Sequence, residues 1–215
     1  RVFISYSSKE KELGGKFTAC LKTYCGYYTF IAHDDMPPSS IFEEEIIKAI
    51  KKSDFFIPLI SKQFKISNFT DQETGIAVDN NKKIIPIKLE DVNPYGFISK
   101  YHALQYRSYP STNYLRKDNL KELSLAIAQI GLSYDTESLY HTKAVNSIVH
   151  AFCNSSSFDT ANAIIKTIVE YDNFNQSHLK QITQAIEKNS QIAGAWGLQD
   201  LKKFLQKKYE IALDE

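Results

Sequence analysis

The stretch that says most about the fold is SDFFIPLIS, at residues 53–61. Its centre, residues 55–60, is the most apolar short run of the chain. A strand with one face in water alternates apolar and polar residues, whereas an unbroken apolar run is typical of a strand that is covered on both faces. The stretch therefore predicts a buried strand of a parallel sheet, which we place at residues 54–60.

Further short apolar runs lie on either side of this one. They predict strands at residues 2–6, 28–32 and 84–89, and a weaker fifth strand at residues 103–107. Helical patterns fit between the strands, at residues 11–24, 41–51, 70–80 and 115–130. This alternation is typical of βαβ units. We therefore expect an α/β fold with a flavodoxin-like parallel sheet, whose ligands bind beyond the carboxyl ends of the strands.

The composition changes after Gly131, and from Ser138 onward the pattern is helical only. Apolar residues then recur three and four positions apart, which predicts about four short helices packed as an all-α module. We place the boundary so that the first domain covers residues 1–132 and the helical module covers residues 133–215. The lone Trp196 falls in an expected turn between helices, and a packed side chain is favoured there over one that faces a partner.

Charge and hydropathy narrow the classes of partner. Lys and Arg together number 26 and Asp and Glu number 25, which gives a formal net charge of +1. A protein that binds phosphate backbones would carry a basic excess or a basic stripe, so we expect no nucleic acid partner. The apolar runs are far shorter than the roughly 20 residues of a membrane helix, so we expect no membrane partner. Because the sequence opens on Arg1 rather than Met, we expect further native residues upstream.

Cysteine and histidine usage argues against a structural metal or a disulfide framework. The three cysteines are odd in number and form no C-x-x-C pair, so a reducing cytoplasm is the expected location. His33 beside Asp34 and Asp35 could imitate a metal cluster, but no further ligand recurs nearby at helical or strand spacing. We therefore expect a solvated loop there and no metal site.

Two segments carry candidate functional residues. A helix that begins near Thr70 places Phe69 at its entry and Glu73 one turn in, on the same side. Glu73 is then either a surface carboxylate that complements the helix dipole or a functional group. Asp34 and Asp35 lie at the carboxyl end of a strand, before an expected capping box of Ser40 and Glu43, and are open to a ligand role.

Four blocks of the sequence, in order and at sensible spacing over about residues 1–130, resemble a TIR domain of the bacterial, NAD-cleaving kind. The blocks are VFISYSSKE at residues 2–10, FIAHDDMPPSSIF at 30–42, SDFFIPLIS at 53–61, and the region 67–87. Within the last block, Ser67-x-Phe69-x-x-x-Glu73 matches the segment that carries the catalytic glutamate in such domains. Two features depart from the family: its usual Trp is Phe69 here, and Ser39-Ser40 replaces the glycine often found in its mobile "BB" loop.

The resemblance implies an NAD+ glycohydrolase that breaks the bond between nicotinamide and ribose. NAD+ is the substrate, and no cofactor or metal is implied. Glu73 is the implied catalytic residue, and the implied substrate-binding residues are Phe3, Ser5, Tyr6, Ser7, Ser8, Lys9, Asp34, Asp35 and Phe69. Two alternatives stay open: a cyclase or base-exchange enzyme that makes an ADP-ribose-derived second messenger, and a non-catalytic scaffold that only binds other TIR domains.

The resemblance also implies partners and a setting. TIR domains of this kind self-associate, so we expect a homo-oligomer or a filament. Bacterial members are commonly fused to a module that senses a trigger, and many serve antiphage defence or cell-death signalling. The helical module at residues 133–215 is therefore expected to assemble or regulate the enzyme, through an activating partner if one exists.

Overall fold

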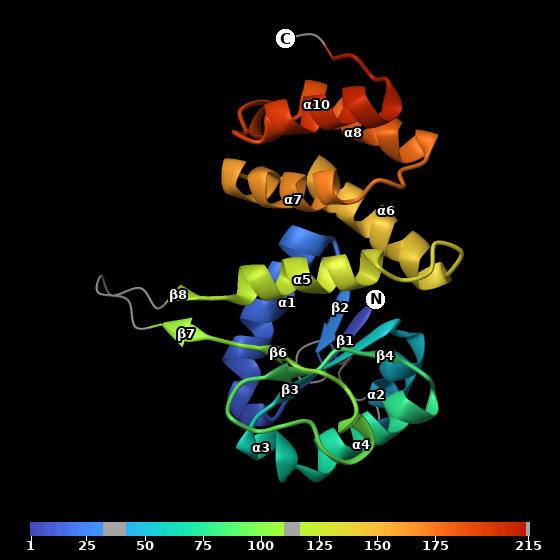
Figure 1. Ribbon diagram of the computed structural model, residues 1–215. Helices are drawn as coiled ribbons and strands as arrows, with labels where there is room; N and C mark the ends of the chain where they lie inside the picture. Colours follow the sequence, from blue (N-terminus) through green and yellow to red (C-terminus); the bar gives the residue numbers. More distant parts are fainter. Residues whose placement is uncertain (32–41, 110–116, 214–215) are drawn as a thin grey trace. The chain divides into compact units, whose positions relative to one another are not determined.

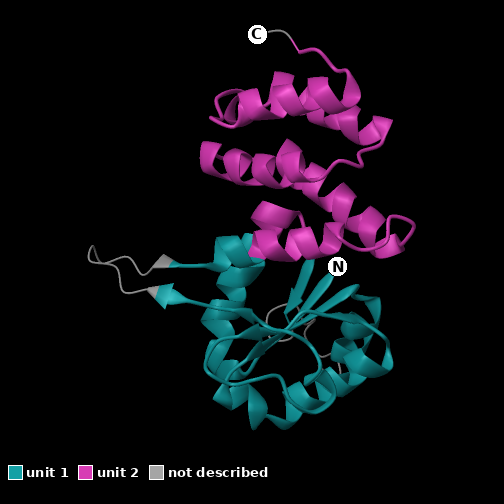
Figure 2. Cartoon of the chain, viewed as in Figure 1, with its two compact units in different colours: residues 1–20, 27–123 teal, residues 21–26, 124–215 magenta. Residues whose placement is uncertain are grey.

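The computed structural model describes residues 1–31, 42–109 and 117–213. The chain divides into two compact units, which are coloured separately in Figure 2. Unit 1 comprises residues 1–20 and 27–123, and unit 2 comprises residues 21–26 and 124–215. The division falls within two helices, α1 (Lys11–Cys25) and α5 (Leu120–Leu132). The boundary expected between residues 132 and 133 coincides with the end of α5. The expected division of roles, between an enzymatic first domain and a regulatory helical module, stays a prediction.

Unit 1 is built on a parallel sheet (Figure 1). Its strands run in the order β2-β1-β3-β5-β6, with β4 also paired to β3. The bounds are β1 Val2–Ser5, β2 Thr29–Ile31, β3 Phe55–Ile60, β4 Lys83–Ile84, β5 Ile87–Lys88 and β6 Leu104–Gln105. All six residues of β3 are buried, as expected for a strand covered on both faces. The expected strands and the parallel sheet are confirmed.

The strand expected at residues 84–89 appears as two short pieces, β4 and β5. β4 pairs with Phe55 and Phe56, and β5 pairs with Leu59 and Ile60 in the same register. Pro86 lies between the two pieces, and it has no N–H to donate to a ladder. The two pieces therefore act as one interrupted strand. Counted in this way, the strand order is the flavodoxin-like 2-1-3-4-5.

Helices connect the strands of unit 1. Their bounds are η1 Ser8–Glu10, α1 and α5 as above, α2 Phe42–Lys52, α3 Lys62–Lys65, α4 Asn68–Asp79 and η2 Gly96–Ile98. Three of the four expected helices start within two residues of the predicted positions, and α5 starts later. Lys117–Asp118 there form β8, which pairs antiparallel with β7 (Ser108–Tyr109). Asn119 supports this hairpin, because its amide bonds the backbone of Gln105 and Arg107.

Gly14, on α1, permits a close approach by Tyr6. A Cβ at Gly14 would lie 2.9 Å from the Tyr6 ring, whereas a Cβ at Gly15 would meet nothing within 4 Å. We expect Gly14→Ala to lower the free energy of unfolding by about 1–3 kcal/mol, because the buried ring must move. Gly15→Ala is the matched control, and we expect it to raise that free energy by about 0.5–1 kcal/mol. Urea denaturation followed by circular dichroism checks both, and equal effects would contradict the packing role of Gly14.

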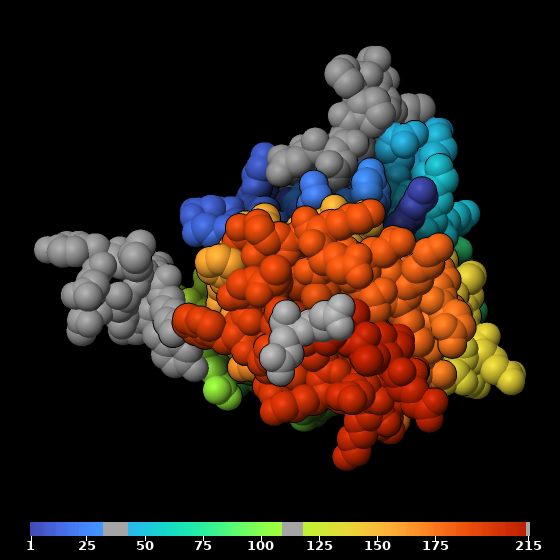
Figure 3. Space-filling view, turned by 90° about the horizontal axis from the view of Figure 1, so that it is seen from above, coloured from blue at the N-terminus to red at the C-terminus, as the bar shows by residue number. Residues whose placement is uncertain are grey.

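Unit 2 is helical in its described part. The helices that follow α5 are α6 Leu139–Cys153, α7 Phe158–Glu170, α8 Gln176–Lys188, α9 Ser190–Ala193 and α10 Leu198–Tyr209. Ser138, Ser157 and Asn175 cap α6, α7 and α8 by accepting hydrogen bonds from backbone N–H groups. Figure 3 looks onto the surface formed by the C-terminal helices of this unit. The expected helical tail is confirmed.

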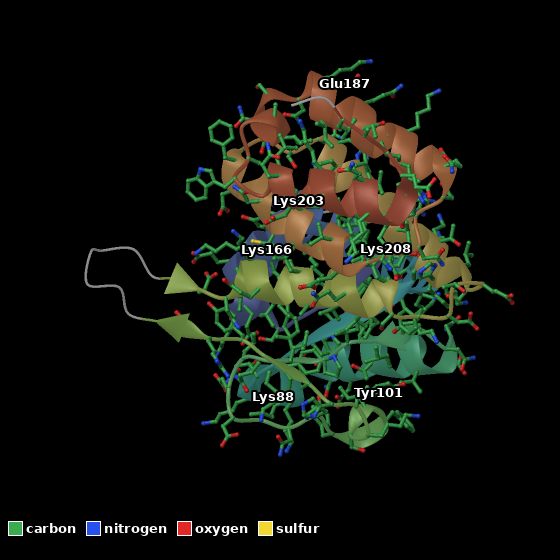
Figure 4. All side chains as sticks on the ribbon, turned by 45° about the horizontal axis from the view of Figure 1, so that its top comes forward. Lys88, Tyr101, Lys166, Glu187, Lys203 and Lys208 are labelled. Atoms are coloured by element: carbon green, nitrogen blue, oxygen red, sulfur yellow. The ribbon has the colours of Figure 1, made fainter. Side chains whose placement is uncertain are left out.

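Charged and aromatic side chains mark the outside of unit 2. Lys166 on α7 and Lys203 on α10 extend from exposed positions (Figure 4). Trp196 is 91% exposed, so the prediction that it packs is wrong. It lies in the turn before α10. Ala195 in this turn is buried, and so is Leu201 on α10. The turn supplies its own small apolar residue to the core, which leaves the indole outside.

Candidate functional site

The site begins where β1 ends, at Ser5, and where α4 begins, after Ser67. The Ser67 hydroxyl caps α4 by accepting a hydrogen bond from the Thr70 N–H. The Thr70 hydroxyl in turn donates to the carbonyl of Phe64, at 2.6 Å. These bonds fix the first turn of α4, and Glu73 follows one turn into the helix.

Ser5 and Glu73 meet although they are 68 residues apart in the sequence. The Ser5 hydroxyl donates to Glu73 Oε2 over 2.5 Å, and both residues are buried. Glu73 is 7% exposed. The interpretation of Glu73 as a surface carboxylate that complements the helix dipole is therefore wrong. The group lies at the carboxyl end of β1, the edge of a parallel sheet where ligands are expected.

Burial sets the electrostatics of Glu73. Loss of water around the carboxylate raises its pKa from 4.5 to about 7, and the hydrogen bond from Ser5 acts in the opposite direction. Among the residues that the structure describes, none forms an ion pair with Glu73 that would offset this burial. The carboxyl group can therefore exchange its proton near neutral pH, which is typical of a functional carboxyl.

The family model for the TIR domain matches residues 2–128. The chain belongs to the TIR domain family. Among solved structures, it is similar to the TIR domain of the Toll-related receptor TRR-2 from Hydra magnipapillata, with 26% sequence identity and a TM-score of 0.44. That match covers 48% of this chain and 82% of the other. A search among curated proteins found no match.

The loop after β1 in this TIR domain contains both buried and exposed side chains. Tyr6 and Ser7 are buried, and the Ser7 hydroxyl caps η1 by accepting from the Lys9 N–H at 3.3 Å. Ser8 and the side chain of Lys9 are exposed. The structure thus brings Ser5 to Glu73 directly, and it presents Ser8 and Lys9 to solvent.

The two phenylalanines of the expected pocket lie in different environments. Phe69, in the first turn of α4, is 54% exposed and can offer a ring face to a ligand. Phe3 is completely buried, and its ring stacks on Phe30 and Phe56 at centroid distances of 5.6 and 5.7 Å. Phe3 therefore serves the core of the TIR domain and has no surface for a substrate. Asp34, Asp35 and the expected capping box at Ser40 lie outside the described residues.

Sequence reasoning missed a second serine–glutamate pair at the same edge of the sheet. The Ser61 hydroxyl donates to Glu10 Oε1 over 2.8 Å. Ser61 directly follows β3, and a polar residue immediately after a buried strand was the signal that could have found it.

No group of three His, Cys, Asp or Glu residues that could hold a metal ion occurs within residues 1–31, 42–109 and 117–213. In the same ranges, no helix has the length and apolar character needed to cross a membrane.

Proposed function

We propose that this TIR domain hydrolyses NAD+ at the bond between nicotinamide and ribose. The observation that supports this most directly is the buried carboxyl of Glu73, held by Ser5 at the carboxyl end of β1. A scaffold that only binds other TIR domains has no need of a desolvated carboxyl group. Burial of such a group costs free energy of folding, so a role in the chemistry is the better explanation.

The proposed reaction needs only one charged protein group. Nicotinamide is bound to ribose as a cationic pyridinium, so it leaves with the electron pair of the broken C–N bond and requires no proton. Positive charge then develops on the ribose as an oxocarbenium ion, which the Glu73 carboxylate stabilises. Water adds to the anomeric carbon and releases one proton, which Glu73 can accept. The products are nicotinamide and ADP-ribose.

Ionised Glu73 also favours binding of the substrate. A pyridinium cation near the carboxylate stabilises its charged form. Substrate binding should therefore lower the pKa of Glu73 from about 7 and favour the loss of its proton at neutral pH. We assign the wall of the nicotinamide pocket to Phe69 and to the loop from Ser5 to Lys9. Asp34 and Asp35 stay candidate substrate contacts, because the resemblance to NAD-cleaving TIR domains implies that role.

The experiment that tests the function is incubation of the full chain with NAD+, followed by chromatography and mass spectrometry of the products. Nicotinamide with ADP-ribose supports hydrolysis. Nicotinamide with a cyclic or base-exchanged ADP-ribose supports the alternative enzyme, which shares the first step. Unchanged NAD+ at all protein concentrations favours the non-catalytic scaffold.

Phe69 gives a prediction about substrate binding. If its exposed ring faces the pyridinium, Phe69→Ala should lose about 0.5–2 kcal/mol of cation–π contact, a fall of about 2- to 30-fold in kcat/KM. Phe69→Trp keeps an aromatic face and should be tolerated. Initial rates at varied NAD+ check this, with circular dichroism as the folding control. Unchanged kinetics in a folded Phe69→Ala protein would remove Phe69 from the pocket.

We also propose that the enzyme works as an assembly, in which unit 2 regulates activity in a defence or cell-death response. Ile66 and Phe97 are exposed apolar residues on unit 1, beside α4 and in η2, and they support a contact with a second copy. Specific activity of the full chain should therefore rise with protein concentration. A dilution series of NAD+ consumption with light scattering checks this. Constant specific activity from a protein that stays monomeric would contradict it.

A further inference from the structure

The Glu10–Ser61 pair joins two elements that frame the site. Glu10 is the last residue of η1, and Ser61 lies between β3 and α3. Ser61 is buried, and its hydroxyl bonds in two directions. It donates to Glu10 Oε1 at 2.8 Å and accepts from the Phe64 N–H at 3.0 Å, which caps α3. Glu10 therefore orients the hydroxyl that fixes the start of α3.

The contacts continue from α3 to Glu73. The carbonyl of Phe64 accepts from the hydroxyl of Thr70, which lies three residues before Glu73 on α4. Glu73 in turn accepts from Ser5 on β1. β1 leads directly into η1, where the Glu10 N–H donates to the carbonyl of Ser7 at 2.8 Å. Glu10 and Glu73 are therefore connected in two ways. One connection runs through Ser61, α3 and Thr70, and the other runs through η1, β1 and Ser5.

The second oxygen of Glu10 is not explained by stability. Glu10 Oε2 is buried, and it accepts no hydrogen bond from any residue that the structure describes. A buried acceptor without a partner destabilises a fold. Groups that disfavour folding are concentrated at functional sites.

We propose that Glu10 is a positioning residue for Glu73: through Ser61, α3 and Thr70 it holds α4 at the distance from β1 at which Ser5 reaches the Glu73 carboxyl. The inference rests on the proposed function for its kinetic consequences, whereas its geometric consequence can be measured without turnover. Glu10 itself need not touch NAD+.

The test compares Glu10→Ala and Glu10→Gln with the control Glu12→Ala in the full chain. Glu12 is two residues away and exposed, and it pairs with Lys16. Because small displacements of a reacting group cost on the order of 10²-fold in rate, Glu10→Ala should lower kcat by about that factor with KM changed much less. Glu10→Gln keeps an oxygen for Ser61 and should restore most of kcat. Glu12→Ala should resemble the wild type.

The activity-independent readout is the titration of the Glu73 carboxyl, followed by carbon NMR and assigned with Glu73→Gln. In Glu10→Ala, α4 is released and water reaches Glu73, so the pKa of Glu73 should fall from about 7 toward 4.5. A merely structural role would lower the folded fraction and leave the titration unchanged.

Unaltered titration of Glu73 in Glu10→Ala would overturn the positioning role, whatever the rates. A shifted titration in a chain that does not cleave NAD+ would support the positioning role and overturn the proposed function. If Glu10→Ala does not fold, Ser61→Ala and Ser61→Thr decide the matter by the same titration. Ser61→Ala should shift it and Ser61→Thr should restore it, and equal titration in the two variants would overturn the inference.

Discussion

Glu73→Gln is expected to abolish NAD+ cleavage while leaving both units folded. The amide has nearly the shape of the carboxyl and can still accept the hydrogen bond from Ser5, but it cannot supply negative charge to an oxocarbenium ion. Removal of one preorganised electrostatic group typically costs 10²–10³-fold in rate, so kcat should fall by about 10²–10³-fold if Glu73 acts as proposed. Release of nicotinamide from NAD+, measured at equal protein concentrations, checks this. Full turnover by a folded Glu73→Gln protein would refute the proposed function.

The same substitution should change how stability depends on pH. Because the pKa of Glu73 is raised from 4.5 to about 7, the folded chain holds a proton that the unfolded chain has lost. This contribution to stability is complete below pH 4.5 and is lost as the pH rises through 7. Its size is on the order of 3 kcal/mol. Glu73→Gln should lack this dependence.

Thermal midpoints from pH 5 to 8 check this contribution. Relative to Glu73→Gln, the wild-type midpoint should fall as the pH rises. Glu12→Gln, a matched change at an exposed carboxylate, should follow the wild type. Parallel curves for the wild type and Glu73→Gln would show that Glu73 is ionised in the folded chain throughout.

The rate of NAD+ cleavage should fall steeply below neutral pH. Only the ionised form of Glu73 stabilises the transition state, so kcat/KM should follow the titration of that carboxyl in the free enzyme, with an acid limb near pH 7. Below that limb the rate falls about tenfold per pH unit, and a fall of two units should cost about 100-fold.

Ser5→Ala isolates the role of the hydrogen bond in this profile. The bond stabilises the charged carboxylate, so its removal should raise the pKa of Glu73 and move the acid limb to higher pH. Glu12→Gln, at an exposed carboxylate outside the assigned pocket, is the control and should leave the limb in place. A profile that is flat from pH 5 to 8, or a limb that does not move in Ser5→Ala, would contradict the assignment of the limb to Glu73.

Local patterns in the sequence predicted most of the regular structure. The apolar runs at β1 and β3 are strand-like over their whole length, and both strands are buried throughout, as such runs require. Failures occurred where a neighbour or a short element decided the outcome. α3 is too short to show a period, and the hairpin of β7 and β8 is supported by hydrogen bonds between the Asn119 side chain and the backbone of Gln105 and Arg107.

The candidate site was predicted in part. The segment from Phe69 to Glu73 was identified by its resemblance to the TIR family, and its helical placement is confirmed. The residue spacing could not distinguish a solvated carboxylate at a helix start from a buried one. The pair of Ser61 and Glu10 was not found, because the two residues are 51 positions apart and no local pattern shows their contact.

The sequence by itself determined the parallel α/β sheet, the helical tail and the helix that carries Glu73, because periodicity and turn residues act over a few positions. Only the tertiary structure decided that Ser5 meets Glu73, that the end of α1 belongs with the helical unit and that Trp196 is exposed. The physical reason is that desolvation and hydrogen bonding depend on which distant segments pack together. The acidity of Glu73, on which the proposed chemistry rests, is therefore a property of the fold.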